Sequence, residues 1–208
     1  GLGVVLSALT GSLDVVFGAT VSGRPPELSG VEKMVGSFSN TVPVRVRIDP
    51  AQSVGELLRN LEAGHRVLGE HHHLGLTTIQ RLAGVGELFD TITVFENRSP
   101  AGDLPRCVGD VEVAGVAVRD ASHYPLSLAA RTGEKLFLEL EFAADRFTAD
   151  AAHEVLQRLV GVLRQLGQAS IPSAGRLDLL LEGERAKLLG SWPWVKTPVR
   201  GPQPSFRP

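Results

Sequence analysis

The sequence is poor in cysteine and in aromatic residues. It contains one cysteine, one methionine and one tyrosine, and aromatic residues make up only 5% of the chain. Because Cys107 is the single cysteine, no intrachain disulfide can form, and a reducing compartment is indicated. The first residues, Gly1–Gly3, also lack the basic segment of a secretory signal. We therefore expect a cytoplasmic protein.

Long apolar runs and an excess of positive charge are missing too. No apolar stretch approaches the roughly 20 residues that a membrane-spanning helix needs, so a membrane is not expected as a partner. The 21 lysines and arginines are balanced by 23 aspartates and glutamates, which gives a net charge of −2. A nucleic-acid partner needs a clustered basic surface, and this balance argues against one. Hydrophobic residues make up 43% of the chain, enough for a substantial core.

The hydrophobic pattern predicts strands that alternate with helices. Short apolar or alternating runs predict strands over 14–22, 41–48, 91–95, 111–118, 124–130 and 135–142. Helical spacing predicts helices over 2–9 and 77–82, with longer ones that begin after Ser53 and Thr148. The last two strands form a hairpin. This order predicts an α/β sandwich, in which helices pack on one face of a mixed β-sheet.

The end of the chain differs in composition from the rest. Residues 193–208 contain five prolines in sixteen residues and have no hydrophobic periodicity. Such a composition is typical of an extended linker or tail. We therefore expect one folded domain over 1–192, followed by a proline-rich tail.

Three consecutive histidines, His71–His73, suggest either a metal site or an exposed helix end. Consecutive side chains on a helix point about 100° apart, so at most two of the three converge. No cysteine, aspartate or second histidine cluster stands at ligand spacing. The exposed helix end is the favoured interpretation, and no metal site is predicted.

Polar residues at two strand ends are candidates for a site. Arg24 follows the first predicted strand and is either an ion-pair former or an ordinary turn arginine. Ser39 and Asn40 stand at the entrance of the second strand, where short polar side chains often satisfy nearby backbone groups. They gain a functional role only if they face a cavity.

A charged segment follows the strand over 91–95. Glu96, Asn97 and Arg98 come directly after its apolar residues. Loop residues in such a place often present charges to a site, although the same pattern also describes an ordinary polar turn.

Several segments resemble the nonribosomal peptide synthetase condensation domains. Val35 to Arg45 reads Val-Gly-Ser-Phe-Ser-Asn-Thr-Val-Pro-Val-Arg, which is similar to the family's motif Val-Gly-x-Phe-x-Asn-Thr-x-x-x-Arg. Phe95–Arg98 is similar to a later motif, and Asp14–Pro25 resembles the strand and turn that open the C-terminal lobe. Glu184–Leu189 looks like the segment that leads toward an adenylation domain. These motifs stand in the family's order, so residues 2–192 resemble the C-terminal lobe of a condensation domain.

The resemblance implies a fold and an activity. Condensation domains consist of two chloramphenicol-acetyltransferase-like lobes in a V and form amide bonds between carrier-bound acyl or peptidyl groups and aminoacyl groups. The first lobe supplies a His-His-x-x-x-Asp-Gly motif, which this sequence lacks. The chain is therefore expected to contain no catalytic residue and to be inactive alone. It needs no directly bound cofactor, because its substrates are carried on the phosphopantetheine of carrier proteins.

The resemblance also implies partners and residue roles. The N-terminal lobe, peptidyl carrier proteins and an adjacent adenylation domain are the expected partners. By position, Ser39 and Asn40 face the substrate tunnel, Glu96–Arg98 lies near its floor, and Tyr124–Phe142 forms a latch that reaches to the first lobe. The alternative is a non-catalytic module that docks a carrier protein or a neighbouring synthetase domain.

Overall fold

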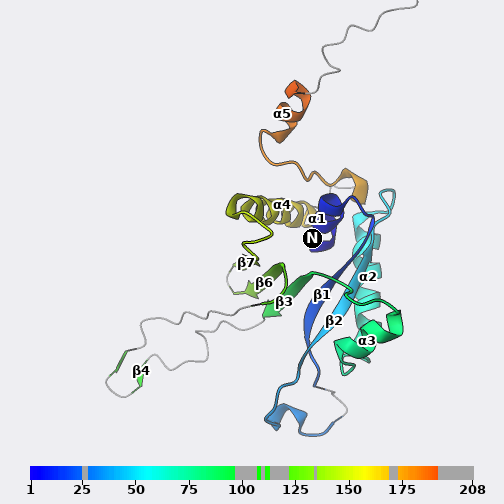
Figure 1. Ribbon diagram of the computed structural model, residues 1–208, viewed down its shortest axis with the longest axis vertical. Helices are drawn as coiled ribbons and strands as arrows, with labels where there is room; N and C mark the ends of the chain where they lie inside the picture. The colour runs from blue at the N-terminus through cyan, green and yellow to red at the C-terminus, as the bar shows by residue number, and fades with distance from the viewer. Residues whose placement is uncertain are drawn as a thin grey trace, which may run out of the picture.

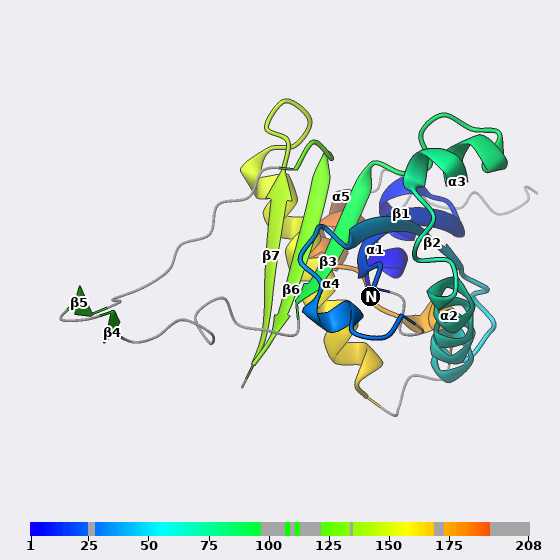
Figure 2. The same cartoon turned by 90° about the horizontal axis from the view of Figure 1, so that it is seen from below.

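A five-stranded mixed sheet forms the centre of the molecule (Figures 1 and 2). The computed structural model describes residues 1–24, 28–96, 107–108, 111–112, 122–133, 135–168 and 173–191. The strands of this sheet are β1 (Asp14–Ser22), β2 (Ser39–Arg47), β3 (Thr91–Glu96), β6 (Leu126–Thr132) and β7 (Leu136–Phe142), and their order is β2-β1-β3-β6-β7. The three inner strands are parallel, whereas β2 and β7 pair antiparallel at the edges. The predicted mixed sheet is confirmed.

A separate two-stranded sheet is formed by residues between β3 and β6 in the sequence. It consists of β4 (Cys107–Val108) and β5 (Val111–Glu112), which pair antiparallel. The predicted strand over 111–118 is therefore confirmed at its first two residues, and its remainder lies outside the described residues. The proline-rich tail over 193–208 also lies outside them.

Three helices cover one face of the large sheet. They are three of the five described α-helices, which are α1 (Leu2–Thr10), α2 (Val54–Gly69), α3 (Leu76–Ala83), α4 (Ala149–Leu166) and α5 (Glu184–Ser191). Residues from α1, α2 and α4 share one core with the sheet, whereas α3 lies beyond α2 and contacts the start of β2 (Figure 1). Helix α5 stands away from the sheet on the segment that follows α4. Helices packed on one sheet face were predicted, and this arrangement is confirmed.

Side-chain alternation along the strands determines which face is buried. Val15 and Phe17 on β1 pair with Val46 and Val44 on β2, so all four point to the same face. This face joins the core, whose helical part includes two completely buried valines and several other apolar side chains, Val4, Val5, Leu57, Val155, Leu159 and Val162.

The helix ends follow from local hydrogen bonding. The Ser53 hydroxyl accepts from the Glu56 amide, and the Glu56 carboxylate accepts from the Ser53 amide at 2.9 Å, which completes the predicted capping box of α2. The Thr148 hydroxyl accepts from the Ala151 amide in the same manner at the start of α4. Helix α1 ends at Gly11, whose φ of 70° is the left-handed conformation that glycine adopts without strain.

The opposite face of the sheet is not covered by any described helix. We call it the open face. On the four strands that concern the site it presents alternate residues, among them Gly18, Thr20, Ile92, Val94, Glu96, Ser127, Ala129, Arg131, Glu139 and Glu141.

Leucine truncation tests this account of the core. Leu159 on α4 is 3% exposed, whereas Leu82 on α3 is 75% exposed. Leu159→Ala removes buried methyl groups and leaves a cavity, so we expect a loss of about 2–5 kcal/mol in the free energy of unfolding. The same substitution at Leu82 is expected to change it by less than about 0.5 kcal/mol. Urea denaturation measures both, and similar losses for the two variants would contradict the packing described.

Candidate functional site

A cavity of about 310 Å³ opens on the open face, along β3, β6 and β7. Its floor is formed by small and apolar side chains, including Ile92, Val94 and Ala129. Charged and aromatic side chains surround this floor. The cavity therefore combines an apolar base with a polar rim, a combination common in ligand sites.

Arg131 joins three strands at the rim of the cavity. Its Nε donates to Glu96 Oε2 at 2.7 Å, and its Nη1 donates to Glu139 Oε2 at 2.8 Å. Glu96 and Arg131 are direct partners across β3 and β6, and Glu139 lies on β7. Hydrogen bonds to Glu96 first, and then to Glu139, raise the pKa of Arg131. Both carboxylates are thereby fixed in place.

Ser127 lies deep in the cavity without a hydrogen-bond partner. The residue is 8% exposed, and its Oγ has no partner among the described residues. Its direct neighbour across β6 and β7 is Glu141, which also lines the cavity. A buried hydroxyl without a partner is uncommon in folded proteins, and this one faces a cavity that a ligand can enter.

Aromatic rings form one wall of the cavity. The ring of Tyr124 lies 4.1 Å from that of His123 and 5.6 Å from that of Phe89, measured between centroids. Phe89 in turn covers Gly18 of β1, where a Cβ atom would overlap the phenyl ring. Burial, and then the nearby Glu87, raise the pKa of the Tyr124 hydroxyl. A glycine at position 18 thus leaves room for Phe89, the ring beside which Tyr124 lies.

Of the tunnel residues predicted from the sequence, Glu96 lies at this cavity. Asn97 and Arg98 lie outside the described residues. Ser39 and Asn40 are consecutive on β2 and therefore point to opposite faces of the sheet. Ser39 shares the side of Ser22 and the open face, whereas Asn40 points toward the helix-covered side.

Asn40 fastens β2 to the turn between α2 and α3. Its Nδ2 donates to the carbonyl oxygens of His72 and Leu74, each at 2.7 Å, and its Oδ1 accepts from the Thr41 amide at 2.9 Å. All the polar atoms of this side chain are thus engaged within the lobe. The sequence pattern marked Asn40, but it did not reveal partners more than 30 residues away.

Arg24 occupies the turn that follows β1. Its guanidinium donates to the carbonyl oxygens of Val31 and Met34 and lies 4.1 Å above the Phe38 ring. Among the described residues its partners are therefore backbone groups and an aromatic ring, and the role of an ion-pair former stays a prediction. These contacts stabilise the segment between the end of β1 and the beginning of β2, which we call the arm.

The histidine triplet lies in the turn between α2 and α3 rather than on a helix end. His71 and His73 are exposed, whereas His72 is partly buried beside His65, at a ring-centroid distance of 5.7 Å. Burial, and then the neighbouring His65, lower the pKa of His72. No group of three or more metal-ligating side chains occurs in the part of the chain that the structure describes.

The predicted hairpin over Tyr124–Phe142 is present, but the prediction that it forms a latch is wrong. Its strands β6 and β7 belong to the central sheet, where β6 pairs with β3 on one side and with β7 on the other. Sequence reasoning identifies a hairpin from its own residues. The parallel pairing of β6 with β3 is a long-range contact that the local pattern does not contain.

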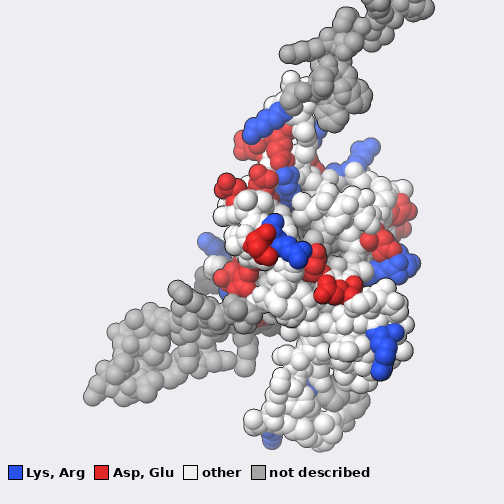
Figure 3. Space-filling model, viewed as in Figure 1, with Lys and Arg blue, Asp and Glu red and all other residues white. Residues whose placement is uncertain are grey.

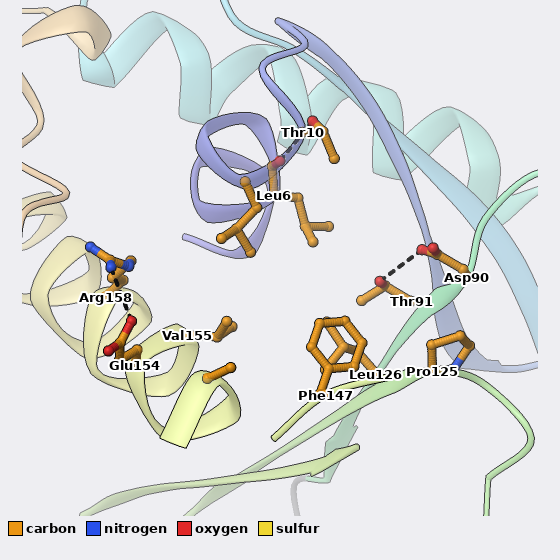
Figure 4. A pocket seen from close by; sticks show the side chains of 12 residues that line it. Leu6, Thr10, Asp90, Thr91, Pro125, Leu126, Phe147, Glu154, Val155 and Arg158 are labelled. Carbon is orange, nitrogen blue, oxygen red and sulfur yellow. Dashed lines mark hydrogen bonds and ion pairs between the residues drawn. The ribbon is translucent and has the colours of Figure 1, made fainter. Parts of the chain in front are cut away.

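A second cavity, of about 380 Å³, lies on the helix-covered side (Figure 4). Leu6, Leu126, Phe147 and Val155 surround an apolar interior between α1, α4 and the beginnings of β3 and β6. The charged groups at its edge bond to neighbouring residues. The Asp90 carboxylate, for example, accepts a hydrogen bond from the Thr91 hydroxyl at 3.1 Å. This cavity offers volume without free polar groups, so we place the candidate site at the open face.

Arg158, at the edge of this second cavity, anchors the segment that follows α4. Its guanidinium binds the Glu184 carboxylate of α5 through two hydrogen bonds, at 2.6 and 2.7 Å, and donates to the Leu179 carbonyl oxygen. One helical turn earlier, Glu154 also contacts Arg158, at 3.4 Å. Bidentate carboxylate binding of this kind is strong and directional.

Comparison with known proteins identifies the family. The Condensation domain model matches residues 1–189, and the chain therefore belongs to the condensation-domain family. Vanchrobactin synthetase VabF of Vibrio anguillarum is 35% identical over 181 residues, which are 86% of this chain and 6% of that protein. Bacitracin synthase 3 of Bacillus licheniformis is 31% identical over 196 residues, which are 91% of this chain and 3% of that protein. The chain thus corresponds to a small part of such a nonribosomal peptide synthetase.

Solved structures show the same fold. A variant of the starter condensation domain of the rhizomide synthetase RzmA superposes with a TM-score of 0.71 at 19% identity, over 86% of this chain and 43% of that one. The X-domain in its complex with OxyB from teicoplanin biosynthesis superposes with a TM-score of 0.69 at 21% identity, over 87% and 41%. The chain spans less than half of each, and its fold is a chloramphenicol-acetyltransferase-like lobe.

No described helix is long and apolar enough to cross a membrane.

Substitution of Asn40 separates a structural role from a role in the tunnel. Asn40→Ala leaves two carbonyl oxygens without their donor, and we expect a loss of about 1–3 kcal/mol in the free energy of unfolding. Ser39→Ala, at the exposed neighbouring position, is the control and should change stability by less than about 0.5 kcal/mol. Chemical denaturation measures both. An Asn40→Ala variant as stable as the wild type would contradict the fastening role.

The Arg158–Glu184 pair predicts a pH dependence. The hydrogen bonds from Arg158, together with that from the Leu181 amide, lower the pKa of Glu184 from 4.5 to about 2. A carboxyl with a lowered folded-state pKa stabilises the fold above its unfolded pKa, and this contribution is lost as the pH falls through the folded value. The stability difference between wild type and Glu184→Gln should therefore be largest above pH 4.5 and shrink toward pH 2.

Urea denaturation at a series of pH values measures this difference. The exposed Glu182, two residues earlier, provides the control, and Glu182→Gln should follow the wild-type profile. A difference for Glu184→Gln that does not vary with pH would show that the pair does not hold this carboxylate ionised.

Proposed function

We propose that this chain is the C-terminal, acceptor-side lobe of a condensation domain. In this role it contributes one half of the tunnel in which a carrier-bound aminoacyl amine attacks a carrier-bound acyl or peptidyl thioester. The observation that carries the proposal is the single sheet with one covered face and one open face, where a cavity with fixed polar groups lies. The open face offers a surface on which a second lobe can pack.

The proposal assigns the chemistry to two lobes. The His-His-x-x-x-Asp-Gly motif is not in this sequence, so the general acid–base group comes from the N-terminal lobe. The present lobe supplies the tunnel wall, with Glu96, Arg131 and Glu139 held rigidly at the rim. Both substrates arrive on the phosphopantetheine of carrier proteins. Residues 1–192 form the lobe in this proposal, and 193–208 form the linker toward an adenylation domain.

Reconstitution from separate halves tests this proposal. The chain is mixed with an N-terminal lobe that contains the motif and with acyl- and aminoacyl-loaded carrier proteins, and mass spectrometry detects the amide. We expect product only when both lobes are present, because neither alone encloses the tunnel. An N-terminal lobe whose motif histidines are replaced by alanine is the control. Stable association of the lobes without any product would contradict the catalytic role.

A docking module is the second candidate. This candidate is supported by the arm between β1 and β2. There the apolar side chains of Leu28 and Met34 are exposed, and Val35 is fully exposed. Figure 3 shows few charged side chains over this lower part of the molecule, in contrast to its upper part. A related fold, the X-domain, is described in complex with OxyB. In this role the chain binds a carrier protein or a neighbouring synthetase domain without need of the N-terminal lobe.

A further inference from the structure

We propose that the open-face cavity selects an acceptor with a positively charged side chain, whose ammonium group binds between Glu141 and the Ser127 hydroxyl. The inference rests on the proposed function, because it takes the open face as the acceptor side of the tunnel. Membership in the condensation-domain family does not by itself specify which acceptor side chain is preferred.

Acidic side chains outnumber basic ones in the lining of the cavity. Three carboxylates, those of Glu96, Glu139 and Glu141, line it together with one guanidinium, that of Arg131. Arg131 is already bound to Glu96 and Glu139. Glu141 has no ion pair or hydrogen bond with another described side chain. The cavity thus holds more negative charge than its own cation can neutralise, and it favours a cationic ligand.

A buried hydroxyl lies beside this acidic lining. Ser127 is more than nine-tenths buried, lines the cavity and has no hydrogen-bond partner for its Oγ among the described residues. It is the direct cross-strand partner of Glu141, and such partners have Cβ atoms about 4.5–5.5 Å apart. One ammonium group can therefore donate to the carboxylate and to the hydroxyl at once.

The reaction itself distinguishes the side-chain amine from the reacting amine. A carboxylate nearby favours the protonated form of an amine, which is not a nucleophile. Binding the α-amine here would therefore oppose amide formation. A side-chain ammonium keeps its proton throughout, so the same electrostatic attraction aids binding without a cost to the reaction. The apolar floor of Ile92, Val94 and Ala129 suits the methylene groups of such a side chain.

Two ligands that differ in one ammonium group test the inference. Lysinamide and norleucinamide are titrated calorimetrically into the full 208-residue chain. Because hydrogen bonds to charged groups are strong, we expect lysinamide to bind about tenfold more tightly or better. In Glu141→Gln this preference should fall to below about threefold, and Ser127→Ala should weaken lysinamide binding by about fivefold.

Glu70→Gln is the matched control, since Glu70 is exposed at the end of α2 and does not line the cavity. It should keep the full preference for lysinamide. Circular dichroism verifies that each variant is folded. Equal binding of the two ligands, no binding of either, or an undiminished preference in Glu141→Gln would overturn the inference.

The reconstitution of the two lobes separates this inference from the proposed function. Equal product from lysyl- and norleucyl-loaded carriers would overturn the selectivity and leave the function standing. A calorimetric preference for lysinamide without any amide product would instead contradict the function and leave a cation site on the open face.

Discussion

The structure depends on the burial of one face of the sheet against α1 and α4. Val5 on α1 and Val162 on α4 are completely buried, and both belong to the core that includes Val15 and Val46 of the sheet. Because side chains alternate along a strand, the burial of this face commits every second residue to the other one. The character of the open face is therefore a direct consequence of the core, and a slip of one residue in any strand would destroy both.

The open face differs from the solvent-exposed face of an ordinary antiparallel sheet. Such a face is mostly polar, yet here Ile92 and Ser127 are each only 8% exposed. Glu139 and Glu141 lie on the edge strand β7, where charges also discourage pairing with other chains. Edge protection accounts for charged residues but not for a buried hydroxyl without a described partner. The combination supports the proposal that this surface receives a ligand and a second lobe.

The sequence predicted the elements well and the site only in part. Strand β1 was predicted with its exact bounds, since a glycine and two prolines follow Ser22, and the caps of α2 and α4 follow from Ser53 and Thr148. The Arg131 bridge could not be predicted in this way, because its members come from three strands and meet only through sheet order. The latch prediction failed for the same reason, since a hairpin pattern does not specify which strand it pairs with.

The segment after α4 lies on the other side of the helix layer from the open face (Figure 1). Two side chains of α4 hold it: Arg158 binds Glu184, and Gln165 exchanges two hydrogen bonds with the backbone of Asp178. Because these contacts use the outer surface of α4, they do not compete with its packing on the sheet. A body joined through α5 is thereby directed away from the cavity. Under the proposed function, this arrangement keeps a connection to a neighbouring domain apart from the face that receives the substrate and the second lobe.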